Sequence, residues 1–286
     1  MKKINKSIMT LAFVSAVLMG CKVEGDANSD SNDNQSTSTL ATIALSSPTY
    51  EVLEEDKTAA IIIQSSALST LDAGISAALD EEEDPVPSAV QSRKNTPKCI
   101  GNDGIATVVV ESPNVSTSGE YSDTGSMTVD ASFTNCSLVI DNEMLTLNGS
   151  FEFELQWDGV ISEQEQGSDD AFGFESVVIT VTFDDFSSTI DNETTMIQGA
   201  VEYTVNDNGL SMEWALAVAS PAWDNKIVTT RSTSPYTYSK TGLAGSWIVN
   251  GKNNSKVEVS IKYDNEGLIY LVSVNGGTEE EIDLTY

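Results

Sequence analysis

The chain has 286 residues, a formal net charge of −30 and a sequence pI near 4.1. This acidity argues against nucleic-acid binding and against electrostatic docking on anionic membrane surfaces, because both require basic patches. The chain contains no histidine, which excludes ordinary Ser-His-Asp and Cys-His catalysis and argues against a zinc site.

Residues 1–20 join a lysine-rich start to a short apolar run, which predicts a secretory signal peptide. The run is too short to span a bilayer as a mature helix. The sequence Leu-Met-Gly-Cys at 18–21 resembles the lipobox of bacterial lipoproteins, and this resemblance implies acylation of Cys21 and anchoring in a membrane. Lys22 follows, which in Gram-negative lipoproteins implies sorting to the outer membrane. An ordinary signal peptide with an incidental Cys21 is the alternative.

Three segments follow the signal peptide. Residues 21–40 are rich in Asp, Asn, Ser and Thr and have almost nothing to bury, so we expect a disordered tether. Residues 41–98 contain one predicted helix, Asp56 to Asp80, with apolar side chains at helical spacing, and then an acidic, proline-containing linker. Residues 99–286 are expected to form the β domain.

After Pro97, apolar and polar residues alternate with a period of two, which predicts half-buried antiparallel strands. Asp-Asn, Asp-Gly and Asn-Gly pairs mark turns between them. The alternating apolar sets are Met127 to Phe133, Phe151 to Trp157, Val177 to Phe183, Val201 to Val205, Leu210 to Val218 and Val257 to Tyr263.

The β region contains an internal repeat of 50 residues. The window Phe133 to Gly159 aligns without a gap with Phe183 to Gly209, and Ile-Asp-Asn-Glu occurs in both. We interpret the repeat as duplicated architecture, because Asp and Asn favour turns and the shared glycines, Gly149 and Gly199, mark bulges or bends. The alternative is a pair of cation sites, although the spacing does not match a calcium loop. Their candidate ligands are Asp141, Glu143, Asp191 and Glu193.

Two cysteines remain besides Cys21, at positions 99 and 136. In an oxidising compartment an even pair predicts a disulfide, so we expect Cys99 to pair with Cys136. We predict no metal and no cofactor.

About ten strands at roughly 4.8 Å spacing make a sheet about 48 Å wide, whereas one helix is only about 10 to 12 Å across. We therefore predict a mainly β fold in which a long antiparallel meander curls into a half-barrel or barrel-like sheet around the N-terminal helix. This element order resembles the half-barrel carriers and receptors of the Lol type and related mycobacterial lipid-binding lipoproteins. The sequence of Phe133 to Ser150 resembles a recurring motif of uncharacterised Gram-negative lipoproteins, which have no assigned activity.

The leading functional expectation is a lipid-anchored cell-envelope module, facing the periplasm or the outside, whose concave apolar face holds a hydrophobic ligand. The candidate lining residues are Phe151, Phe153, Trp157, Tyr203 and Trp214, and simple core packing is the competing interpretation. The alternative function is a structural or protein-interaction lipoprotein without a small-molecule ligand. An enzyme is not expected. Paired carboxylates could hydrolyse glycosides, but Asp184 and Asp185 are adjacent on a strand and so point to opposite faces, and Glu163 and Glu165 fall in a predicted polar loop.

Overall fold

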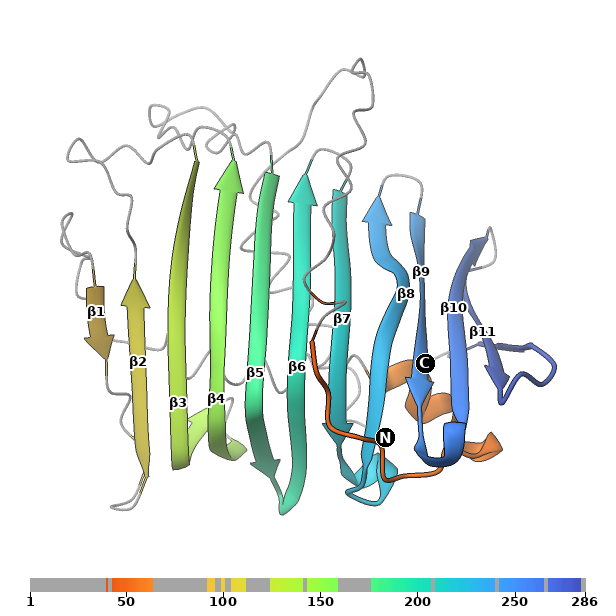
Figure 1. Ribbon diagram of the computed structural model, residues 1–286, viewed down its shortest axis with the longest axis horizontal. Helices are drawn as coiled ribbons and strands as arrows, with labels where there is room; N and C mark the ends of the chain where they lie inside the picture. Colours follow the sequence, from red (N-terminus) through yellow and green to blue (C-terminus); the bar gives the residue numbers. More distant parts are fainter. Residues whose placement is uncertain are drawn as a thin grey trace.

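A computed structural model describes residues 40, 43–63, 92–95, 99–100, 104–111, 124–140, 143–158, 176–206, 209–239, 242–264 and 267–283. These residues form one antiparallel sheet in which each strand pairs with the next one along the chain. Figure 1 shows this meander face on. Its twelve described strands are β1 (Ser92–Asn95), β2 (Ile105–Glu111), β3 (Thr124–Ile140), β4 (Glu143–Asp158), β5 (Ser176–Ile190), β6 (Glu193–Asn206), β7 (Gly209–Ala219), β8 (Ile227–Ser239), β9 (Gly242–Asn250), β10 (Lys256–Asp264), β11 (Gly267–Val274) and β12 (Glu280–Ile282).

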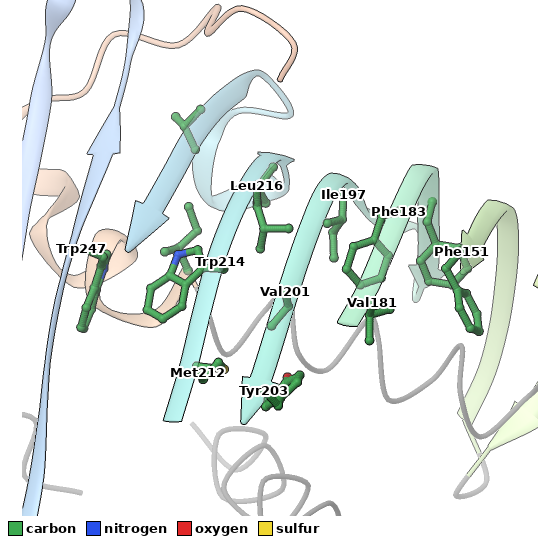
Figure 2. Close-up of a cluster of buried hydrophobic side chains, with 14 of the residues drawn as sticks. Phe151, Val181, Phe183, Ile197, Val201, Tyr203, Met212, Trp214, Leu216 and Trp247 are labelled. Carbon is green, nitrogen blue, oxygen red and sulfur yellow. The ribbon is translucent and has the colours of Figure 1, made fainter. Parts of the chain in front are cut away.

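The six alternating segments predicted from the sequence all lie in described strands. Their apolar side chains point to one side of the sheet, which we call the apolar face, and Figure 2 shows part of it. The opposite side is the polar face. β1 belongs to the sheet although its residues fall in the predicted linker, and β12 forms the other edge of the described sheet with acidic residues at Glu280 and Glu281.

The prediction that the sheet curls or closes was wrong. The strand order is linear from β1 to β12, no pairing joins these two strands in the described chain, and Figure 1 shows an open sheet. The prediction assumed that the N-terminal helix was the only cover for the apolar face. That helix touches β9 and β10, yet Val108 in β2 and Leu147 in β4 are completely buried, so burial of this face does not require curvature.

The predicted helix is described only at residues 57–63, after a 3-10 turn at Glu54–Asp56. Asp56, the first residue of the predicted helix, ends the 3-10 turn, accepts a hydrogen bond from the Leu53 amide at 2.7 Å and is almost fully buried. Ala60, Ile61 and Ile63 pack into the main hydrophobic core. The remaining predicted helical residues, with Leu68 and Leu71, lie outside the described residues.

The repeat is duplicated architecture. In β3 and β4 the register shifts between Phe133 and Cys136, and 50 residues later it shifts between Phe183 and Phe186 in β5 and β6. Phe133 lies opposite Gly149, and Phe183 lies opposite Gly199. The predicted bulges are confirmed, with the extra residue in β3 and β5 and the predicted glycines opposite it.

Both glycines are required by their surroundings. Gly149 has a φ of +88° and Gly199 a φ of +118°, a region that L side chains rarely adopt. A Cβ atom on Gly149 would lie 2.2 Å from the Asp185 carbonyl oxygen, and one on Gly199 would lie 2.1 Å from the Ala215 carbonyl oxygen. Each glycine thus lets a bulged or neighbouring strand approach closely.

The turn chemistry also agrees with the sequence. Asp191 and Asn192 connect β5 to β6 with φ values of +53° and +66°, as a two-residue type I′ hairpin requires. The matching turn of the first copy, at 141–142, lies outside the described residues.

The predicted disulfide is confirmed. Cys99 and Cys136 are bonded, with Cα atoms 4.9 Å apart. Cys136 is fully buried and occupies the position that Phe186 holds in the second copy. For a sequence separation of 37 residues the chain-entropy model gives a stabilisation of about 4 kcal/mol.

The close approach at the bulges predicts a large cost for a single methyl group. We expect Gly149→Ala to lower the free energy of unfolding by about 3 kcal/mol, measured by urea denaturation, because it combines an unfavourable φ with a backbone clash. Gly276→Ala is the matched control: its φ is +73°, but no atom lies within 4 Å of the added Cβ, so only about 1 kcal/mol should be lost. Equal losses in the two variants would contradict this explanation.

Candidate functional site

The five residues predicted to line a ligand site all lie on the apolar face. Phe151, Trp157, Tyr203 and Trp214 are between 1% and 7% exposed, and Phe153 is half-buried against them. They come from three strands, β4, β6 and β7, and belong to one hydrophobic cluster. Figure 2 shows Phe151, Tyr203 and Trp214 among the other side chains of this cluster. Their role in holding a ligand stays a prediction.

Two tryptophans join the sheet to the helix. The Trp214 ring lies 5.7 Å from the Trp247 ring, centroid to centroid, and its indole N–H donates to the Thr230 hydroxyl at 3.1 Å. The Trp247 indole N–H donates to the Ala60 carbonyl of the helix at 3.0 Å. Both buried indoles therefore have hydrogen-bond partners, as buried tryptophans require.

The polar face is crossed by residues 43–53, which we call the N-terminal strap. Figure 1 shows it running along β6 and β7 and then across β8 towards β10. The Gln198 side-chain oxygen accepts hydrogen bonds from the Ser46 amide at 3.0 Å and from its hydroxyl at 2.6 Å. The amides of Thr49 and Tyr50 both donate to the Ile227 carbonyl.

Small side chains make room for the strap. Ala200 and Ala215 lie opposite each other on the polar face and are completely buried. With Leu40 they form a second hydrophobic cluster, against which Ile43 and Leu45 pack. Alanine is thus used on the polar face where a chain segment covers it.

A cavity of about 280 Å³ lies between the strap and strands β8 and β9. Among the groups around it is Arg231, whose Nη1 donates to the Leu40 carbonyl at 2.7 Å. None of the five predicted ligand residues lines it. The lining residues are Ile43, Leu45, Ser46, Ser47, Pro48, Thr229, Thr230, Arg231 and Asn250.

Beyond the strap, the polar face carries carboxylates directly opposite one another. Glu152 lies opposite Asp130, and Glu202 lies opposite Glu213. Burial, followed by the charge of Asp130, raises the pKa of Glu152. Burial and then the charge of Glu213 raise the pKa of Glu202. Like charges in directly opposed positions destabilise a sheet, so the carboxylates of each pair repel each other across the two strands.

Of the remaining sequence-predicted groups, those that the structure describes are not gathered into a site, and Glu163 and Glu165 lie outside the described residues. Asp191 and Glu193 are exposed at the β5–β6 turn, while Asp141 lies outside the described residues. Asp184 and Asp185 are exposed at the bulge of β5. Among the residues with a described placement, no three or more His, Cys, Asp or Glu side chains are grouped as a metal site would need.

Cys21 lies outside the described residues, so its acylation stays a prediction. None of the helices that the structure describes is long and apolar enough to span a membrane.

Comparisons with known proteins give no relative. The chain matches no family model, and no curated protein or solved structure is significantly similar to it.

The sequence reasoning did not identify the cavity at Arg231. Its walls come from a segment near residue 45 and from strands near residues 230 and 250, and nothing in the local pattern brings these together. One signal was available. Residues 226–262 carry six Lys or Arg and a single Glu, a local reversal of the overall charge.

The opposed carboxylates predict a specific pH dependence. The folded-state pKa of Glu202 is raised above the ordinary value of 4.5, so the folded chain binds this proton more tightly than the unfolded chain. The stability contributed by that proton is present at low pH and is lost as the pH rises from 4.5 through the folded-state pKa. We expect Glu202→Gln to stabilise the fold by about 0.5 kcal/mol at pH 7, with no gain at pH 4.

Urea denaturation at the two pH values measures this difference. Glu258→Gln is a suitable control, because Glu258 lies on the same face but pairs with Lys256 at 2.9 Å, so its removal should not stabilise the chain. A gain for Glu202→Gln that is equal at both pH values would show that removal of a partly buried charge repelled by Glu213 is not its cause.

Proposed function

We propose that this chain is a lipid-anchored interaction module of the bacterial cell envelope, which presents the polar face of its sheet to another macromolecule. The lipobox-like Leu-Met-Gly-Cys at 18–21 supports the anchor, since two acyl chains give stable membrane attachment where one does not. Lys22 supports placement in the outer membrane.

The observation that carries the interaction function is the contrast between the two faces. The apolar face is buried, and its aromatic side chains are used to pack the core. The polar face beyond the strap is a broad surface of exposed or half-exposed side chains, including Thr182 between Glu152 and Ala200. An open sheet of this width offers a large area without needing a cavity, and such areas suit macromolecular partners.

The hydrophobic-ligand function is the less favoured candidate. A ligand on the apolar face would have to displace side chains such as Trp214 and Phe151, which are 1% and 3% exposed. Burying one such aromatic side chain contributes about 1.5 to 3 kcal/mol, so a ligand must replace contacts that are already made.

The anchor is tested directly by labelling. We expect the full chain, expressed in a Gram-negative host, to incorporate radiolabelled palmitate and to fractionate with the outer membrane. Cys21→Ser should lose the label and remain attached to uncleaved leader, because the acceptor thiol is gone. Cys99→Ser is the matched control and should keep the label. A labelled Cys21→Ser variant would refute the lipobox assignment.

The interaction surface is tested by photo-crosslinking in the cell. A photoreactive residue at Thr182, which is exposed in the middle of the polar face, should give one discrete adduct of higher mass. The same residue at Asn192, exposed in the β5–β6 turn, should give none. If neither position crosslinks and the native mass of the purified chain shows a bound lipid, the hydrophobic-ligand function replaces this one.

A further inference from the structure

The cavity beneath the strap has polar side chains that the sheet register brings together. Thr229 in β8 pairs with Asn250 in β9, so their side chains lie side by side. Arg231 is two residues beyond Thr229 in the same strand and therefore shares its face. All three line the cavity, and Ser46, Ser47 and Pro48 of the strap line it as well.

These three side chains have hydrogen-bonding capacity to spare. Arg231 is half-buried, and its one described hydrogen bond is to the Leu40 carbonyl at 2.7 Å, which leaves four of its five N–H donors. No carboxylate of the described chain forms an ion pair with it, although the sequence holds 44 acidic and only 14 basic residues. Among the residues that the structure describes, neither the Thr229 hydroxyl nor the Asn250 side-chain amide has a hydrogen-bond partner.

The segment that supplies the β8 and β9 wall of the cavity has a charge opposite to that of the whole chain. Residues 226–262, which supply its β8 and β9 wall, contain six basic residues and one acidic residue, a net charge of +5 in a chain of −30. Lys256 in β10 lies opposite Asn250 on the polar face. It forms an ion pair with Glu258, which is the single acidic residue of this segment. A local positive potential concentrates anions.

We propose that this cavity is an anion site that binds a phosphate group, with Arg231 as its principal contact and with Thr229 and Asn250 as further hydrogen-bond donors. A guanidinium presents two parallel N–H groups that match two phosphate oxygens, which a lysine cannot do. The cavity volume of about 280 Å³ admits a phosphate and a few further atoms but not an acyl chain.

Two sources could supply this group: a free phosphate compound or the headgroup of an anionic phospholipid. Only the second depends on the proposed lipid anchor. Cys21 precedes Leu40 by 19 residues, and the tether predicted for this stretch would have a root-mean-square span of about 24 Å. The cavity would then be held within reach of the headgroups of its own membrane.

The test is isothermal titration of the full chain, purified in neutral detergent, at constant pH and salt. The two probes are inorganic phosphate and glycerophosphoglycerol, the deacylated headgroup of phosphatidylglycerol. We expect Arg231→Gln to raise the Kd of the bound probe about tenfold or more. Arg231→Lys should raise it as well, because it keeps the charge and loses the paired donors. Lys262→Gln, which removes the same charge from an exposed position on β10, should leave the Kd within about twofold.

Thr229→Val separates binding from folding, because it removes a donor and leaves the bond between Arg231 and Leu40. It should weaken binding about threefold or more. Arg231-dependent binding of inorganic phosphate supports a site for free phosphate compounds, and binding of the diester alone supports a headgroup site. Binding of neither probe, or equal losses from Arg231→Gln and Lys262→Gln, would overturn the proposal without bearing on the photo-crosslinking result.

Discussion

The central part of the sheet depends on two equivalent bulges, in β3 and β5, that keep long strands in phase with the core. β3 has 17 residues, and its core-facing positions are odd up to Phe133 and even from Cys136 onwards. If β3 paired regularly here, with no bulge, Cys136 and Leu138 would face the opposite side of the sheet. The same change of parity occurs between Phe183 and Phe186 in β5. The bulges therefore let strands much longer than average bury one continuous apolar face.

Aromatic rings fill the space at these bulges. The rings of Phe133, Phe151 and Phe183 all lie within 6.1 Å of the Phe186 ring, centroid to centroid. Phe133 and Phe183 each stand opposite a glycine, where the missing side chain leaves room for a ring. The glycines with positive φ and the aromatic rings opposite them therefore form each bulge together. This explains why both copies of the repeat keep the Phe and the Gly.

Much of this architecture could be predicted from the sequence, for identifiable reasons. Period-two alternation places Phe151, Val181 and Trp214 on one face, because the side-chain direction of a strand is a local property. The pairing of Cys99 with Cys136 followed from their number and compartment. Curvature was predicted wrongly, because it depends on what covers a face as well as on how wide the face is. The strap was not predicted either: its contacts with Gln198 and Ile227 span more than 150 residues, and no local pattern encodes them.

The two copies of the repeat differ at a position where the side chains have different structural roles. Asn148 in the first copy accepts a hydrogen bond from the Asn135 amide at 2.7 Å and so stabilises its own bulge. Gln198, at the equivalent position 50 residues later, instead holds Ser46 of the strap. The Gln198 side chain is one methylene longer than that of Asn148 and reaches beyond its own strand. At this position, Asn therefore stabilises a bulge, whereas Gln binds the strap. The strap in turn forms one wall of the cavity at Arg231. The repeat accounts for the bulged frame of β3 to β6, and the departure from it at Gln198 accounts for the contact with the strap on the polar face.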